Sequence, residues 1–225
     1  MQSESAGLTQ QEAIMLFTKP TMVDPRVALR GRETPVLTQP FFHRVFGHRI
    51  DRVPAGAEVA VLGLGCFWGA EKLYWTTPGV LNTSVGYAGG YTPNPTYEEA
   101  CSGRTGHAEV VKVVYDPEQL SYEDVLRIFF ENHDPTQGFR QGNDRGTQYR
   151  SAIYTLNDDQ ARRARAVREA FAPEFASAGY GTITTEIAPL PAYFEAEAYH
   201  QQYLAENPFG YCPVHSTGVT CSPPS

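Results

Sequence analysis

From residue 58 onward, short apolar runs alternate with amphipathic stretches along the chain. The run from Val59 to Leu64 lies between Gly56 and Gly65 and is typical of a buried strand. The same pattern predicts further strands at 80–87, 107–115, 150–155 and 182–187, and helices at 66–75, 96–100, 121–132, 157–178 and 194–204. This alternation favours an α/β domain with a doubly wound parallel sheet, although it fixes no strand order and does not exclude a mixed sheet.

The two ends of the chain lack this periodicity. Residues 1–55 carry several prolines and read as an arm laid over the domain, and the expected anchors are Phe41, Phe42, Val45 and Phe46. Residues 207–225 are rich in Gly, Pro and Ser, which is typical of a flexible tail. We therefore expect an N-terminal arm at 1–55, one α/β domain at 56–206 and a tail at 207–225.

Composition excludes several classes of protein. Of the 225 residues, 41% are hydrophobic and 19% are charged, which suits a folded domain rather than a disordered chain. The net charge of −7 gives no attraction to nucleic acid or anionic membranes, so we expect neither as a partner. No run approaches the ~20 apolar residues of a membrane span, and the first residues do not resemble an export signal. We expect a soluble, cytoplasmic monomer that acts on a small or neutral group.

The four cysteines are Cys66, Cys101, Cys212 and Cys221. They are too sparse for a scaffold held by disulfides, and no pair has the close spacing of zinc ligands. We therefore expect reduced thiols, no metal site and no bound cofactor.

Cys66 follows a predicted buried strand and opens a predicted helix. The free N–H groups of a helix start favour an anion, so this position is expected to lower the pKa of the thiol. Phe67 and Trp68 come next and could form an apolar cup suited to a methyl or thioether group. The alternative is a buried structural cysteine at a strand end.

Polar side chains elsewhere are candidates for the rest of a site. Glu109 lies near the start of a predicted strand, where burial would raise its pKa toward use as a general acid; the alternative is a solvated carboxylate at the strand end, the ordinary expectation for a lone Glu. Asp144 and Tyr149 lie in a polar loop and could form hydrogen bonds to a ligand, or could only hold a turn. His200 lies on the last predicted helix, where a surface histidine is the ordinary expectation.

Five ordered segments resemble one known family. They are G-C-F-W-G-A-E at 65–71, G-Y-A-G-G-Y at 86–91, P-N-P-T-Y-E-E-A-C-S-G-R-T-G-H-A-E at 93–109, Q-G-N-D-R-G-T-Q-Y-R-S at 141–151 and H-Q-Q-Y-L at 200–204. These segments are similar to those of the A-type peptide methionine sulfoxide reductases. The resemblance implies a ferredoxin-like two-layer sandwich with a mixed sheet, and reduction of the S epimer of methionine sulfoxide, free or in proteins, as a repair of oxidative damage.

The resemblance also implies a role for each candidate. Cys66 would attack the sulfoxide sulfur, and Glu109 would protonate the oxygen. The remaining pocket residues would assist: Tyr97 and Tyr149 at the oxygen, Phe67 and Trp68 at the methyl group, and Asp144 and His200 at the substrate main chain.

Recycling is implied for the tail. Cys212 would condense with the sulfenic acid at Cys66, Cys221 would then form a disulfide with Cys212, and thioredoxin would reduce that bond. The segment 213–216 between the two cysteines is stiffer than the glycine-rich tails common in the family, so the order of the tail cysteines stays open. Cys101 is interpreted as structural, and the arm is given no catalytic role.

The same residues are compatible with two other functions. A cysteine hydrolase or acyltransferase would use Cys66 with His107 and Asp144, and would need no tail cysteines. A non-enzymatic module would bind oxidised methionine through an aromatic pocket and would need no nucleophile. Only the reductase uses Cys66, Glu109 and both tail thiols together.

Overall fold

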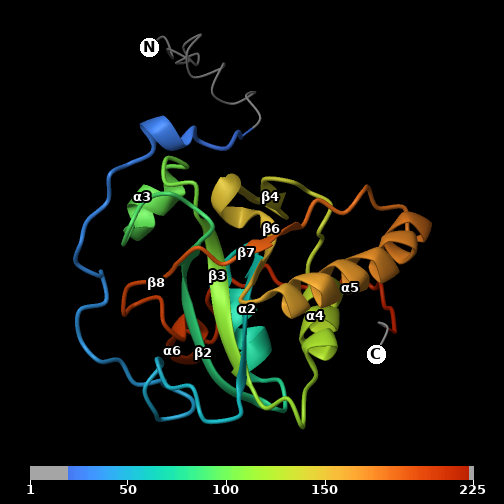
Figure 1. Cartoon of the computed structure of the whole chain (residues 1–225), viewed down its shortest axis with the longest axis horizontal. Helices are drawn as coiled ribbons and strands as arrows, with labels where there is room; N and C mark the ends of the chain where they lie inside the picture. The colour runs from blue at the N-terminus through green and yellow to red at the C-terminus, as the bar shows by residue number, and fades with distance from the viewer. Residues whose placement is uncertain (1–19, 223–225) are drawn as a thin grey trace, which may run out of the picture.

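The computed structural model describes residues 20–222, which form a six-stranded sheet with helices packed on it (Figure 1). The strand order is β7-β6-β1-β3-β2-β8. The strands are β1 (Glu58–Leu64), β2 (Val80–Ala88), β3 (Ala108–Tyr115), β6 (Ser151–Thr155), β7 (Glu186–Pro189) and β8 (Tyr193–Glu195). A two-stranded ladder of β4 (Arg140–Gln141) and β5 (Asp144–Arg145) lies in the loop before β6.

Strand directions correct the prediction of a parallel sheet. Only β6 and β7 pair in parallel, while every other pairing in this sheet is antiparallel. The strands β1 and β2 run in the same direction, as a strand-helix-strand unit predicts, but β3 lies between them and pairs with both. The doubly wound parallel sheet is therefore wrong, and the mixed sheet is confirmed.

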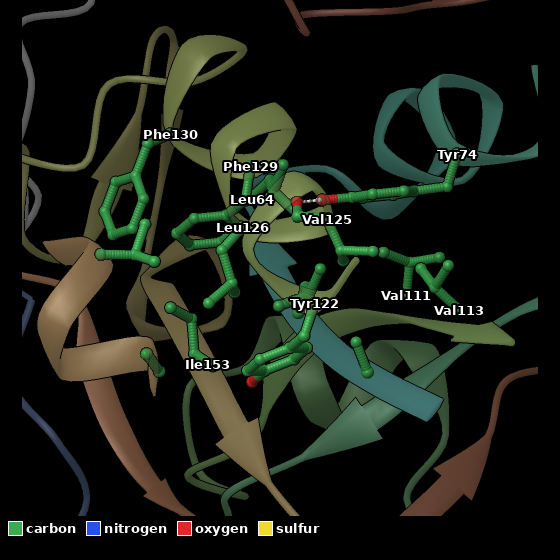
Figure 2. Close-up of a cluster of buried hydrophobic side chains, with 14 of the residues drawn as sticks. Leu64, Tyr74, Val111, Val113, Tyr122, Val125, Leu126, Phe129, Phe130 and Ile153 are labelled. Carbon is green, nitrogen blue, oxygen red and sulfur yellow. Dashed lines mark hydrogen bonds between the residues drawn. The ribbon is translucent and has the colours of Figure 1, made fainter. Parts of the chain in front are cut away.

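Three helices build the main hydrophobic core on one face of the sheet. They are α2 (Phe67–Trp75), α4 (Tyr122–Glu131) and α5 (Asp158–Ser177). Figure 2 shows Tyr74 of α2 reaching toward α4, where its hydroxyl donates a hydrogen bond of 2.9 Å to the Val125 carbonyl. Within residues 20–222, no helix combines the length and apolar character that crossing a bilayer requires.

The helix starts follow from capping residues. The Ser121 side chain accepts a hydrogen bond from the Asp124 N–H, and the Asn157 side chain accepts one from the Gln160 N–H. Shorter elements complete the fold: η1 (Pro25–Val27), α3 (Tyr97–Cys101), η2 (Thr147–Tyr149) and α6 (Tyr203–Glu206).

The region after β7 differs most from the sequence prediction. The sequence pattern predicts a helix at 194–204, but β8 pairs with the free edge of β2 and only the short α6 follows. Gln202 adopts a left-handed backbone with φ of 50°, which an α-helix does not permit. The strand expected at 182–187 begins only at Glu186, because Thr184 instead bonds through its N–H to the Pro135 carbonyl.

Only part of the expected set of anchors holds the arm. Phe42 and Val45 are exposed, whereas His43 and Ile50 are buried, and Phe46 packs partly against the core. The arm passes α3 and the β8 edge of the sheet before it enters β1 (Figure 1). Phe42 and Val45 are therefore wrong as anchors, and the arm before residue 20 lies outside the described residues.

After α6, the described part of the tail lies along the domain without regular structure. Thr217 donates its N–H to the Glu131 carbonyl at the end of α4, and Val219 is only 4% exposed within the main core. The segment between the two tail cysteines therefore packs against the helices.

Candidate active site

Cys66 stands at the junction of β1 and α2. Gly65 has φ of +88°, which lets the chain turn sharply out of the strand, and a Cβ there would lie 2.6 Å from the Gln141 side chain. Cys66 then caps the helix start and is 7% exposed. The apolar strand β1 thus places the Cys66 thiol in a buried position at the start of α2.

The pKa of this thiol is shifted in the direction opposite to the prediction. Burial raises the pKa of Cys66 above its ordinary value, and the neighbouring Glu109 carboxyl raises it further. The N–H groups of Trp68 and Gly69 favour the thiolate but offset only part of this increase. The expected lowered pKa is therefore wrong for the substrate-free protein, in which Cys66 is a protonated thiol.

Glu109 lies beside Cys66 on the central strand β3. It is 1% exposed, and one carboxyl oxygen accepts a 3.0 Å hydrogen bond from the Phe67 N–H, the residue after Cys66. Burial raises the pKa of Glu109 to about 8. The carboxyl is therefore mostly protonated at pH 7 and can donate a proton.

One small cavity gathers most of the candidate residues. It has a volume of about 130 Å³, which suits a small chemical group better than a drug-sized ligand. Its lining comes from the start of α2, from α3, β3, β5 and η2, and from the tail, and consists of Cys66, Phe67, Trp68, Tyr97, Glu109, Asp144, Tyr149 and Tyr211.

The two candidate tyrosines are half-buried in this cavity. Burial raises the pKa of both Tyr97 and Tyr149 above the ordinary value, and Glu109 adds to the shift, so both hydroxyls are donors. Their hydroxyls also lie near Cys101, whose pKa burial raises to about 11. The structural role of Cys101 stays a prediction.

His200 lies behind Trp68 rather than on the cavity surface. It is 1% exposed, so the expected surface histidine is wrong, and its Nδ1 accepts a 3.0 Å hydrogen bond from the Trp68 indole N–H. Burial lowers the pKa of His200 to about 4, so the ring is neutral. Trp68 also stacks on Tyr203 with ring centroids 4.0 Å apart.

Asp144 and Tyr211 close one side of the cavity. The Tyr211 hydroxyl donates a 3.1 Å hydrogen bond to one Asp144 oxygen, while the second oxygen is buried without a partner among the described residues. That second oxygen is available to a substrate N–H group. The sequence analysis does not identify Tyr211 as a site residue. Its position directly before the proposed recycling cysteine Cys212 is the sequence feature that indicates a place near the cavity.

The tail cysteines lie in different places. Cys212 is exposed, and its sulfur is 3.2 Å from the position that a Cβ on Gly69 would occupy, next to the helix turn that begins at Cys66. Cys221 is half-buried, and its thiol approaches the Ala170 carbonyl of α5 at 3.6 Å. All four thiols are free.

The geometry does not favour a hydrolase. The His107 Nδ1 accepts a hydrogen bond from the Gly90 N–H, so its Nε2 carries the proton that it donates to the Thr92 carbonyl. His107 is not among the residues that line the cavity. It therefore cannot serve Cys66 as a base in this arrangement.

Known proteins share this architecture. A family model described as peptide methionine sulfoxide reductase matches residues 58–221. A relative from Salinispora tropica, named peptide methionine sulfoxide reductase MsrA, is 62% identical over 209 residues, covering 91% of this chain and 94% of that protein. The structure of methionine sulfoxide reductase A of Corynebacterium diphtheriae is 55% identical, with a TM-score of 0.82, and covers 92% of this chain and 100% of that one.

A more distant structure is Mxr1 from Saccharomyces cerevisiae in complex with Trx2. It is 25% identical with a TM-score of 0.50, and the match covers 74% of this chain and 93% of that one. Fold and relatives together define an oxidoreductase. The chain belongs to the A-type peptide methionine sulfoxide reductases, which reduce methionine sulfoxide to methionine.

Proposed function

We propose that Cys66 attacks the sulfur of methionine-S-sulfoxide while Glu109 protonates the oxygen. The observation that carries this proposal is that the Cys66 thiol and a protonated Glu109 share one small cavity. A sulfoxide oxygen is a poor leaving group until it is protonated, so the nucleophile needs an acid beside it.

Atoms and electrons balance in this step. Two electrons pass from the Cys66 sulfur to the substrate sulfur, the S–O bond breaks, and the oxygen ends on Cys66 as a sulfenic acid. Glu109 gives its proton to the oxygen and receives the proton that leaves the Cys66 thiol. No net proton is consumed, which suits a site where both groups begin protonated.

The other lining residues are proposed to orient the sulfoxide. Tyr97 and Tyr149 donate hydrogen bonds to the oxygen as negative charge develops on it, in the manner of an oxyanion hole. Phe67 and Trp68 contact the methyl group. Asp144 accepts a hydrogen bond from a substrate main-chain N–H with its unpartnered oxygen. The contact of His200 with the substrate stays a prediction, because Trp68 lines the cavity and His200 does not.

We propose that the tail recycles the enzyme. Cys212 attacks the sulfenic sulfur of Cys66 with loss of water, Cys221 attacks Cys212 and frees Cys66, and thioredoxin reduces the resulting disulfide. The position of Cys212 beside Gly69 supports the first step, and the relative crystallised with Trx2 supports thioredoxin as reductant. Cys221 must leave α5 for the second step, because its sulfur lies against Ala170.

A ferredoxin-like core is proposed for the central strands. The order β1-α2-β2-β3-α4-β6 along the chain and the antiparallel neighbours β6-β1-β3-β2 in the sheet support it. In this description β7, β8, the arm and the tail are additions around the core.

The direct test of the proposed chemistry is one turnover without reductant. The reduced protein mixed with methionine-S-sulfoxide should release methionine and form a Cys66 sulfenic acid, which dimedone traps as an adduct seen by mass spectrometry. Cys66→Ser should give neither product. Methionine formation by Cys66→Ser at the parental rate would refute Cys66 as the nucleophile.

The pH dependence follows from the Glu109 pKa of about 8. Glu109 must carry its proton to protonate the oxygen, so kcat/KM for the sulfoxide should fall as the pH rises above about 8. The Cys66 thiol has a higher pKa than Glu109, so it is a weaker acid and a poorer proton donor to the sulfoxide oxygen. Single-turnover rates measured from pH 6 to 10 should show this fall. A rate that keeps rising through this range would contradict Glu109 as the proton donor.

Gly69 provides a test of where Cys212 docks. A Cβ on Gly69 would lie 2.7 Å from the Val214 side chain and 3.2 Å from the Cys212 sulfur, so Gly69→Ala should displace the tail while it favours the helix. We expect thioredoxin-coupled turnover to fall roughly tenfold, which corresponds to ~1.4 kcal/mol and lies at the lower end of the usual cost of overpacking, ~1–3 kcal/mol. The single-turnover reduction rate should stay close to that of the parent.

Gly181→Ala is the matched control, because a Cβ there would meet nothing closer than 3.8 Å. Both rates of this variant should equal those of the parent. If Gly69→Ala recycles as fast as Gly181→Ala, recycling does not depend on Cys212 docking at this turn of α2.

A further inference from the structure

A buried carboxylate that the proposed chemistry does not use lies on the helix that begins after Cys66. Glu71 of α2 is fully buried and accepts three hydrogen bonds: from the Thr83 hydroxyl at 3.0 Å, the Gln202 N–H at 2.7 Å and the Gln202 side-chain amide at 2.6 Å. Burial raises the pKa of Glu71 to about 7, while every partner is a donor, and these hydrogen bonds favour the carboxylate over the carboxylic acid. Among residues 20–222, no Lys or Arg forms an ion pair with it.

The hydrogen bonds continue from Glu71 into the arm. The His43 Nδ1 accepts hydrogen bonds from the N–H groups of Val45 and Phe46, so its Nε2 carries the proton and donates to the Thr83 hydroxyl at 2.8 Å. Thr83 in turn donates to Glu71. The arm therefore completes the set of donors around a carboxylate behind the active site, a function that sequence reasoning did not assign to it.

A second contact ties the arm to the same place. The Arg44 N–H donates a 3.2 Å hydrogen bond to the Gln202 side-chain oxygen. Both polar ends of the Gln202 amide are thus used, one by the arm and one by Glu71. These bonds hold a residue in the left-handed backbone conformation, which is costly for any residue except glycine.

The segment 200–202 is joined to α2 at two points. His200 accepts the indole N–H of Trp68, and Gln202 donates to Glu71, which lies one helical turn after Trp68. Figure 1 shows the region around α6 next to β2 and close to α2. Since Trp68 lines the cavity, a shift of this segment would move His200 and release the indole ring.

We propose that Glu71 is a positioning residue for sulfoxide reduction, which holds the segment 200–202 on α2 and thereby fixes the Trp68 ring at the cavity. His43 and Thr83 assist by supplying the buried chain of donors. The proposal rests on the proposed function in one respect, the contact of Trp68 with the substrate methyl group. It gives the arm a part in substrate binding without placing it at the reacting atoms.

Glu71→Gln tests the proposal at constant size. A glutamine would turn an N–H₂ donor toward groups that are themselves donors, and a hydrogen bond to Gln202 would be lost. In the thioredoxin-coupled assay we expect KM for methionine-S-sulfoxide to rise ~10-fold, with kcat within ~3-fold of the parent, because ground-state positioning is lost and the reacting groups remain. Thr83→Val removes one donor and should raise KM in the same direction by less.

Fluorescence reports the indole ring independently of activity. The chain has two tryptophans, so in a Trp75→Phe background all emission comes from Trp68. Adding Glu71→Gln should shift this emission to longer wavelength and increase its quenching by acrylamide. If Trp68 does not contact the substrate methyl group, KM stays unchanged while the emission still shifts. If Glu71 does not hold Trp68 in place, the emission stays unchanged as well.

Glu123→Gln is the matched control, because Glu123 pairs with Arg163 between α4 and α5, away from the cavity. It should lower the thermal midpoint without changing KM or the Trp68 emission. Should Glu71→Gln fail to fold, Thr83→Val carries both readouts. The proposal is overturned if the folded variants lower only the thermal midpoint and leave KM and the Trp68 emission at parental values.

Discussion

Glu109→Gln is expected to lower the single-turnover rate of sulfoxide reduction by ~10²-fold or more, the usual contribution of a general acid. Glutamine keeps the size of the side chain and can still accept the Phe67 N–H through its amide oxygen, but it has no proton of suitable acidity to give. Methionine released per chain, measured by rapid quench with reduced protein in excess, gives the rate.

Two controls keep this result specific. The decline in rate above pH 8 should vanish in Glu109→Gln, because the titrating carboxyl is gone. Glu123→Gln, which removes a carboxylate between α4 and α5, should react at the parental rate. A Glu109→Gln rate within about fivefold of the parent would mean that another group protonates the oxygen.

Cys212→Ser should release about one methionine per chain and then stall, even with thioredoxin present. The Cys66 thiol and its acid are untouched, so the first turnover proceeds, but the sulfenic acid has no neighbouring thiol to resolve it. Steady-state turnover should therefore drop by ~10²-fold or more, the difference between an intramolecular partner at high effective concentration and an external thiol.

The other cysteine variants separate the roles of the thiols. Cys101→Ser should cycle as the parent does. Cys221→Ser should accumulate a Cys66–Cys212 disulfide, which peptide mapping identifies, and accumulation of a Cys66–Cys221 disulfide in Cys212→Ser would reverse the proposed order. Full thioredoxin-dependent turnover by Cys212→Ser would show that Cys212 is not the obligatory resolving thiol.

Local sequence patterns were sufficient where one segment determines its own structure. The apolar run before Gly65 forms β1, and the thiol that follows it lies at a helix start inside a cavity. The sequence left Glu109 open between a buried and a solvated carboxyl, and the central position of β3 in the sheet decides for burial, which raises the pKa of Glu109 to about 8.

Features that depend on distant segments were not predictable from local patterns. The lowered pKa expected for Cys66 ignored its burial and the carboxyl that β3 brings beside it. The residues at 194–204 have a composition typical of a helix. However, Phe194 pairs with the free edge of β2 as part of a strand, and Gln202 adopts a left-handed backbone conformation in which its N–H bonds to Glu71. Antiparallel pairing likewise depends on β3 entering between β1 and β2, which alternation alone does not encode.

The arm shows the same limit in its anchors. Of the expected aromatic anchors, Phe46 packs against the core but Phe42 is exposed, and His43 between them in the sequence is buried. His43 could not be recognised as an anchor without Thr83 and Glu71, which lie on other elements. A buried polar side chain is stabilised by partners that only the folded chain assembles.

The most direct test of the central claim is a thioredoxin-coupled assay on separated sulfoxide epimers. NADPH oxidation through thioredoxin reductase and thioredoxin should follow addition of the S epimer of methionine sulfoxide and stay at background with the R epimer. The same preference should hold for a peptide that carries one methionine sulfoxide. Turnover of the R epimer alone, or of neither epimer, would contradict a reductase in which Cys66 attacks the sulfur opposite the proton donated by Glu109.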